Sequence, residues 1–447
     1  MLTTHATPVG GLDRAAVLDW YRLNRTRSRT LFDLVEDDAY KTNPIPLRHV
    51  IAFYEGHLPV FSFNTLIKKA LGQPGIDERY ERLFARGIDP EDEAAARASG
   101  RDSWPERREI LAYAAEADRR IIDVLENEDL TRAGHPLLDR AEAVFTILEH
   151  EAMHHETLLY ILHRLPYSMK IRPAGADPVL GGEAPVRRTA KVPAGQATLG
   201  AHRDQQTFGW DNEFPRQVVD VPAFEIDVFP VTNRDWLDFQ NAGGYERRDW
   251  WTEKGWAWRA ENDVHHPLFW EPRRHGFVWR GLFEEVPLPA AWPVYVSWEE
   301  AAAYARWKGG RLPTEAEFHR AAYGTPEGKE RPFPWGEDAP DERRGNFDFA
   351  HWDPLPVDAH PAGASLWGVQ DLLGNGWEWT STPFDGFPGF RPMNSYPEYS
   401  ADFFDHEHYV MKGGSSATAR ELLRPSFRNW FRSNYPYPYV TFRVARS

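Results

Sequence analysis

The sequence predicts an α+β multidomain protein with a helical N-terminal half and a C-terminal half of short strands, loops and few helices. Apolar residues recur at helical spacing through four long segments, 12–38, 46–71, 105–127 and 136–164. Four amphipathic helices of this length predict a four-helix bundle over residues 1–170. From residue 191 the helical period fades and Gly and Trp become frequent, which is typical of a loop-rich α+β domain over 191–447.

Prolines and capping residues mark the ends of these elements. Pro46 and Pro136 open the second and fourth helices, where a first-turn proline is tolerated. The charged stretch 72–103 predicts a loop with a short helix near 77–86, and the Pro- and Gly-rich residues 171–190 predict a connector. In the C-terminal half, N-caps at Ser297 and Thr314 predict two firm helices, 297–308 and 314–323.

Composition limits the classes of function. The net charge of −15 disfavours a general nucleic-acid binder or a binder of anionic membranes. The chain has no cysteine, which excludes disulfides, thiolate metal sites and a cysteine nucleophile. No apolar run reaches 18 residues and the first residues show no apolar signal region, so we expect a soluble cytoplasmic protein.

The fourth helix carries histidines on a core-facing stripe. Ile147, His150, His154, Leu158 and Ile161 stand at i, i+3, i+7, i+11 and i+14 and share one helix face. Two imidazoles four residues apart on such a face can point at one divalent metal ion. The alternative is a pair of core histidines satisfied by hydrogen bonds.

The C-terminal half resembles the formylglycine-generating-enzyme (sulfatase-modifying-factor) fold, a C-type-lectin-like domain. The resemblance rests on Phe224-Glu-Ile-Asp227, Pro230-Val-Thr-Asn233, Pro293-Val-Tyr-Val-Ser-Trp298, Arg311-Leu-Pro-Thr-Glu-Ala-Glu317, Pro334-Trp-Gly336, Gly374-Asn-Gly-Trp-Glu-Trp-Thr380 and Lys412-Gly-Gly-Ser415. The fold alone implies no function, and the formylglycine enzymes use cysteines that this chain lacks. We interpret Gly374, Asn375 and Glu378 as structural.

The N-terminal half resembles a DinB-type bundle, and the combination resembles the sulfoxide synthases (EgtB-, OvoA- and SenA-like enzymes). That family uses non-haem Fe(II) and O2 to join sulfur or selenium to a histidine-derived imidazole. Its His-x3-His-x-Glu motif matches His150, His154 and Glu156, and its third ligand matches His57 in Tyr54–Phe61. His49, about two helical turns earlier, is the competing third ligand.

Two acidic residues near the predicted ligands are expected to have different roles. The resemblance implies that Glu156 fixes the tautomer of a ligand through its second N–H. For Glu151 we expect an ordinary solvated helix face.

The resemblance also implies substrate contacts from the C-terminal half. Tyr396 matches the tyrosine that supplies a proton or hydrogen bond during O2 chemistry, and Tyr399 is its partner. The remaining predicted substrate-binding residues are Arg428, Asn429, Trp430, Phe431, Tyr435 and Tyr437. The aromatic faces suit a trimethylammonium group, and Arg suits a carboxylate. In the alternative interpretation the tyrosines pack a loop and Arg428 ties down the C-terminal strand.

The family therefore implies a mononuclear non-haem iron oxidoreductase acting on imidazole C2 of hercynine. The expected donor is a selenosugar, γ-glutamylcysteine or cysteine. We favour the selenoneine branch of the family over the ergothioneine branch. Met153 and Phe431 replace a Gln and an acid that are frequent in ergothioneine enzymes, so the donor pocket is expected to differ. The alternatives are an ovothiol-type histidine/cysteine sulfoxide synthase, a zinc-dependent DinB-type thiol transferase and a non-catalytic binding protein.

Overall fold

The computed structural model describes residues 12–85 and 104–447 and divides into two compact units. The helical unit comprises the described residues up to Ala174 together with Met393–Pro397, and the lectin-like unit comprises Gly175–Pro392 and Glu398–Ser447. The five residues 393–397 thus belong to the helical unit, although they lie within the range 191–447 that we assigned to the C-terminal domain. Among the described residues, no helix combines the length and apolarity that crossing a bilayer requires.

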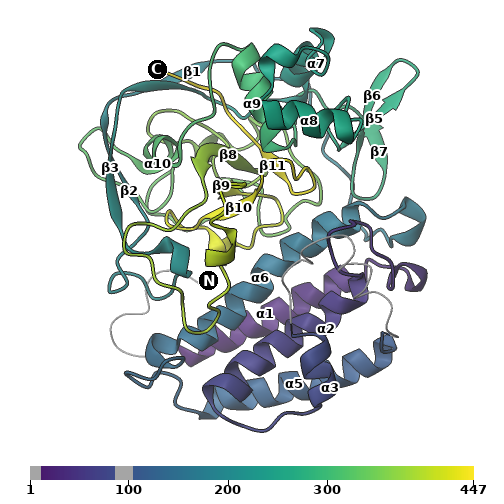
Figure 1. Ribbon diagram of the computed structural model, residues 1–447, viewed down its shortest axis with the longest axis vertical. Coiled ribbons are helices and arrows are strands. Elements are labelled where there is room, and N and C mark those ends of the chain that lie inside the picture. Colours follow the sequence, from purple (N-terminus) through teal and green to yellow (C-terminus); the bar gives the residue numbers. More distant parts are fainter. Residues whose placement is uncertain (1–11, 86–103) are drawn as a thin grey trace. The chain divides into compact units, whose positions relative to one another are not determined.

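The helical unit is a four-helix bundle, as predicted (Figure 1). Its elements are α1 (Arg14–Phe32), α2 (Ile51–Ser62), a π-helix (Phe63–Ala70), α3 (Glu78–Leu83), α5 (Arg107–Asn127) and α6 (Glu142–His163). Both α1 and α2 pack against α5 and α6, so each long helix has two long neighbours. The part of the predicted 72–103 loop and 77–86 helix that falls in 86–103 lies outside the described residues.

The lectin-like unit is built on a four-stranded sheet with the order β10-β9-β8-β11 (Figure 1). Its strands are β8 (Gly376–Pro383), β9 (His408–Gly414), β10 (Asn429–Arg432) and β11 (Val440–Thr441). Strand β9 runs antiparallel to β8 and β10, and β11 runs parallel to β8. In this register Trp430 lies opposite Val410 and Phe431 lies opposite Tyr409.

Smaller sheets surround it. The first contains β1 (Thr189–Val192), β4 (Phe224–Asp227) and β12 (Ala445–Arg446), the second contains β2 (Gly195–Leu199) and β3 (Gln217–Val221), and the third contains β5 (Trp270–Arg273), β6 (Gly276–Arg280) and β7 (Glu285–Pro287). Because β1 and β12 pair with opposite edges of β4, one sheet holds both the beginning and the end of the unit.

Besides short 3-10 helices, the lectin-like unit contains four α-helices: α7 (Asn233–Asn241), α8 (Glu253–Glu261), α9 (Trp298–Trp307) and α10 (Glu315–Tyr323). The predicted α9 and α10 are confirmed, and the side chains of Ser297 and Thr314 accept hydrogen bonds from the third residue of each helix. We did not predict α7 and α8. Their signals were the N-caps Thr232 and Thr252, of which Thr232 forms a capping box with Asp235.

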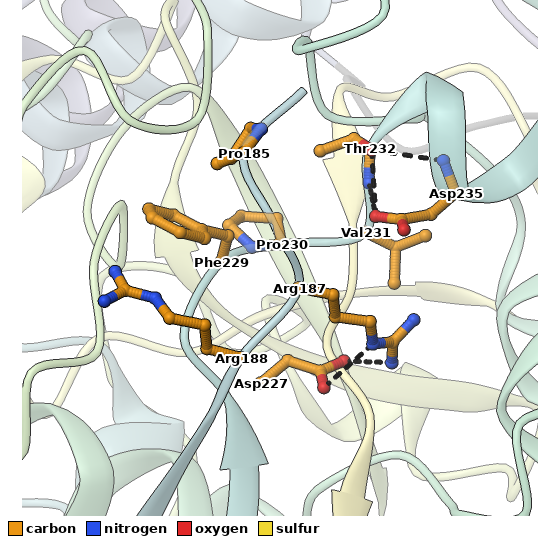
Figure 2. Close-up of a pocket in the computed structure, with 9 residues that line it drawn as sticks. All are labelled: Pro185, Arg187, Arg188, Asp227, Phe229, Pro230, Val231, Thr232 and Asp235. Atoms are coloured by element: carbon orange, nitrogen blue, oxygen red, sulfur yellow. Dashed lines mark hydrogen bonds and ion pairs between the residues drawn. The ribbon is translucent and has the colours of Figure 1, made fainter. Parts of the chain in front are cut away.

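The connector residue Arg187 is held by β4. Its Nε donates to Asp227 at 3.3 Å and its Nη1 donates to the Tyr304 hydroxyl at 2.6 Å. Figure 2 shows this ion pair beside the Thr232–Asp235 cap, lining a small pocket of the unit. Arg187, Asp227, Thr232 and Asp235 thus form hydrogen bonds within this unit, which gives them a structural role.

A fully buried ion pair stabilises the centre of the lectin-like unit. The Arg443 guanidinium donates to Glu378 at 2.8–2.9 Å and also to the carbonyls of Val228 and Gln370, and the side chains of Arg443 and Glu378 are 0% exposed. An unpaired buried charge costs more than the pair contributes. Glu378 therefore acts as the structural residue that the sequence predicted.

Replacement of this acid tests the pair. Glu378→Leu leaves Arg443 charged and unpaired, so the free energy of unfolding should fall by about 3–5 kcal/mol. Denaturation followed by tryptophan fluorescence reports this unit, because only Trp20 and Trp104 lie in the other one. The matched control is Glu225→Gln in β4, whose partner Lys191 is exposed and 3.8 Å away. Equal midpoints for the two variants would contradict this role.

Candidate metal centre

Three histidines from two helices of the bundle converge. His57 comes from α2, and His150 and His154 come from α6. One ring nitrogen from each lies within 4.8 Å of the others, and the Nε2 atoms of His57 and His150 are 3.3 Å apart. Two nitrogens bound at about 2.1 Å to one ion lie about 3.0–3.4 Å apart for bond angles of about 90–110°. The His57–His150 pair therefore has the spacing of two imidazoles on one metal ion, and His154 lies close enough to be the third ligand.

His49, the competing ligand, lies elsewhere on the same segment. Its ring stacks on Phe53 at a centroid distance of 4.0 Å. Within 12–85 and 104–447, the one group of three or more potential ligands that could hold a metal consists of His57, His150 and His154. The geometry thus favours His57 as the third ligand.

Hydrogen bonding explains the burial of these histidines only in part, because the Nε2 atoms of His57 and His150 lie within hydrogen-bond distance of each other but other ring nitrogens of the trio stay unsatisfied. His57 Nδ1 lies 2.7 Å from the Phe84 carbonyl and must donate to it, which leaves the Nε2 lone pair directed at the group. The Nδ1 atoms of His150 and His154 are buried and have no hydrogen-bond partner among the described residues. The alternative of core histidines satisfied by hydrogen bonds therefore fits this trio poorly.

Burial also keeps the three imidazoles neutral. Desolvation lowers the pKa of His57 to about 4, although the hydrogen bond to Phe84 opposes the shift. Desolvation and the neighbouring histidines hold the pKa values of His150 and His154 well below their usual range. Neutral imidazole is the form that binds a metal, so the trio is ready to bind at neutral pH.

Aromatic rings fix the orientation of the imidazoles. Phe61 stacks on His150 with ring centroids 3.5 Å apart and an interplanar angle of 9°, and Phe53 stacks on His57 at 5.1 Å and 15°. Tyr54 lies 6.0 Å from the His154 ring. Phe53 and Phe61 stand four residues before and four after His57, so their helical spacing was the signal that could have identified them.

Buried acids hold the two ligand-bearing helices. On α2, Glu55 accepts hydrogen bonds from Nε and Nη2 of Arg107 and one from the Tyr40 hydroxyl. On α6, Glu151 pairs with Arg25 at 2.6 Å. Our expectation that Glu151 lies on a solvated face was wrong, because its side chain is 1% exposed and neutralised by Arg25.

Glu156 and Tyr396 are both placed in the helical unit. Glu156 is buried on α6, but no hydrogen bond joins it to the Nδ1 atom of a ligand, since those of His150 and His154 have no partner among the described residues and that of His57 donates to Phe84. A role of Glu156 in orienting a ligand stays a prediction. Tyr396, carried by Met393–Pro397, lies with its ring centroid 6.2 Å from that of His150 and 5.3 Å from that of Phe61. Within the helical unit, the structure thus brings Tyr396 to the histidines, whereas Tyr399 belongs to the lectin-like unit.

Tyr399 and Trp430 belong to an aromatic cluster of the lectin-like unit. Tyr399 stacks on Trp210 at 3.9 Å and presents its edge to Trp430 at 5.1 Å. Trp430 in turn stacks on Phe384 at 4.0 Å and 7°. Asn429, half-buried beside it on β10, accepts a hydrogen bond from the Trp430 amide.

The other predicted substrate residues make contacts within the lectin-like unit. Arg428 is buried, pairs with Glu315 at 3.0 Å and donates to the Asn212 and Asp385 carbonyls, as in the alternative of an Arg that ties down the strand. Phe431 stacks on Tyr435 at 5.2 Å, and Tyr437 lies 5.0 Å from Tyr435. Binding roles for Arg428, Phe431, Tyr435 and Tyr437 stay predictions.

Comparison with known proteins gives the same two-part organisation. The model of the sulfatase-modifying factor enzyme 1-like domain matches residues 179–447, and the model of the DinB superfamily matches residues 21–158. These matches agree with the lectin-like unit and with the helical bundle.

Several curated proteins are similar to this chain over two thirds or more of its length. A hercynine oxygenase of Mycolicibacterium smegmatis is 38% identical over 364 residues, which cover 74% of this chain and 83% of that protein. A hercynine oxygenase of Mycobacterium tuberculosis is 41% identical over 303 residues, covering 67% and 69%. Ergothioneine biosynthesis protein 1 of Neurospora crassa is 28% identical over 514 residues, and the match spans 96% of this chain but 57% of that longer protein.

Three observations point to one family: the order of the two domains, the histidine group in the bundle and the sequence identity to these relatives. The chain belongs to the sulfoxide synthase family.

Proposed function

We propose that this protein is an O2-dependent non-haem iron enzyme that forms a C–Se or C–S bond at imidazole C2 of hercynine. The observation that carries the proposal is the buried trio His57, His150 and His154, with Tyr396 beside it. The names of the relatives support hercynine as the acceptor.

Three neutral imidazoles fit divalent iron, and when bound the iron would supply a centre for O2 chemistry and for a soft donor. The same donor set also fits zinc, and it is the family relationship that supports iron. His57, His150 and His154 would hold the ion, and Phe61 and Phe53 would keep two of the rings in place. The Tyr396 phenol would donate a proton or hydrogen bond while O2 is reduced.

The overall reaction balances with O2 as the only oxidant. The donor loses its S–H or Se–H hydrogen and the imidazole loses its C2 hydrogen, as the new C–S or C–Se bond forms. If the product is a sulfoxide, one oxygen atom of O2 becomes the sulfoxide oxygen and the other leaves as water with the two hydrogens. If it is not, the same two hydrogens leave with O2 as hydrogen peroxide.

Aromatic faces support the assignment of a quaternary ammonium acceptor. A trimethylammonium group offers no hydrogen-bond donor, so it binds best against aromatic faces. Tyr399 and Trp430, in the aromatic cluster with Trp210 and Phe384, provide such faces in the lectin-like unit. For the donor we prefer a selenosugar, with γ-glutamylcysteine and cysteine as the sulfur counterparts.

Metal analysis and oxygen uptake test this function. Protein prepared without oxygen and loaded with Fe(II) or Zn(II) is mixed with hercynine and each donor while O2 is followed. We expect about one Fe(II) per chain and O2 consumption that requires iron, hercynine and donor together. Thiol transfer by the zinc form without O2 uptake would support the zinc transferase, and coupling to histidine instead of hercynine would support the ovothiol-type enzyme. Tight iron binding without O2 uptake would contradict the proposal.

A further inference from the structure

The residues that carry Tyr396 are fastened to the first turns of α6. The Ser395 amide donates to Glu142 Oε1 at 3.0 Å, and the Ser395 hydroxyl lies 2.9 Å from Thr146 Oγ1. Asn394 adds a bond from its Nδ2 to the Pro136 carbonyl at 3.2 Å. These contacts connect residues about 250 positions apart in the sequence, so local chain geometry does not explain them.

The directions of these bonds can be deduced. Thr146 has a single hydroxyl proton, and its Oγ1 donates to the Glu142 carbonyl at 2.8 Å. The Ser395 hydroxyl therefore donates to Thr146. The side chains of Thr146 and Ser395 are buried, at 0% and 1% exposure, so either hydroxyl without its partner would be a buried unsatisfied group.

The helical register connects this contact to the metal group. Thr146, His150 and His154 stand at i, i+4 and i+8 and share one stripe of α6. Ser395 pairs with Thr146 and the next residue, Tyr396, lies beside His150, one helical turn further on. A helix that presents the ligands thus also sets the position of the phenol.

We infer that Glu142, Thr146 and Ser395 form a latch that positions the Tyr396 phenol against the histidine trio. The inference rests on the proposed function for its kinetic consequence. The latch residues are positioning residues, because they act through Tyr396. A displacement of about 1 Å of a reacting group can cost roughly 10²-fold in rate. We therefore expect the hydrogen bonds at the amide and the hydroxyl of Ser395 to affect the rate through the position of Tyr396.

The test is Thr146→Val, which keeps the shape of the side chain and removes the hydroxyl. Thr146→Ser restores the hydroxyl, and Thr30→Val is the matched control, because Thr30 on α1 makes the same bond to the carbonyl four residues earlier and is exposed. Hydrogen exchange of the peptide containing 393–397 is measured on the metal-free protein. We expect exchange about two- to tenfold faster in Thr146→Val, the worth of one hydrogen bond, and unchanged in the other two variants.

Kinetics then separate positioning from general damage. With iron bound, Thr146→Val should lower kcat for coupling roughly tenfold to 10²-fold with little change in the KM for hercynine. In a Tyr396→Phe background the same substitution should cause no further loss, because the phenol is already absent. Equal losses in both backgrounds, or an unchanged exchange rate, would overturn the latch. An inactive wild-type protein would instead overturn the proposed function, and the exchange measurement would still decide the latch.

Discussion

His150→Ala, His154→Ala and His57→Ala are each expected to abolish tight iron binding and coupling activity. Removing one imidazole leaves two ligands, and an incomplete site loses most of its affinity. The ring centroids of the trio lie 4.5–5.1 Å apart. Among the described residues, no other His, Asp or Glu forms a group with two of these histidines, so none can replace the lost ligand. Iron per chain is measured by elemental analysis after gel filtration, and the fold is followed by circular dichroism.

His49→Ala is the matched control for this series. His49 stacks on Phe53, which itself stacks on His57, so the substitution removes an imidazole from the same segment without removing a ligand. It should retain about one iron per chain. Loss of iron in His49→Ala with retention in His57→Ala would show that the ligand assignment is wrong.

Tyr396→Phe should lower coupling roughly 10²–10⁴-fold, the usual contribution of a positioned acid, or divert O2 into oxidation of the donor. The substitution removes one hydroxyl and keeps the ring that lies against Phe61, so the fold should hardly change. Iron affinity and the KM for hercynine should stay close to wild type. Steady-state rates and the ratio of coupled product to oxidised donor measure both effects.

Tyr409→Phe provides a matched control. Tyr409 is also half-buried and also keeps a ring contact after loss of the hydroxyl, with Trp298 at 4.0 Å. It should show wild-type turnover and product ratio. If Tyr396→Phe behaves in the same way, the phenol of Tyr396 only packs against the bundle.

The parts of the fold that depend on local pattern could be predicted. The amphipathic periods predicted the bundle, and the stripe of α6 placed His150 and His154 together because four residues bring side chains onto one face. The capping residues of α9 and α10 were visible as well. The position of His57 beside them depends on how α2 packs against α6, and residue spacing gives no information about that packing. Only the family motif indicated His57.

Other features were beyond local patterns. Glu151 was expected in solvent, and no spacing rule reveals that Arg25 on another helix reaches it. Between Tyr396 and Tyr399 the chain passes from one compact unit to the other, so two tyrosines of one motif have different surroundings. The family motif predicted that Arg428 binds substrate. In the folded protein its guanidinium pairs with a buried carboxylate, Glu315, which no local pattern indicates.

The central claim is bond formation at imidazole C2 of hercynine, and one measurement tests it directly. Hercynine deuterated at C2 is incubated with the Fe(II)-loaded protein, O2 and, in parallel, a selenosugar, γ-glutamylcysteine or cysteine, and the products are analysed by mass spectrometry. We predict a coupled product that has lost the C2 deuterium, with the selenosugar as the preferred donor. Recovery of hercynine with its deuterium intact and no coupled mass with any of the three donors would contradict the account.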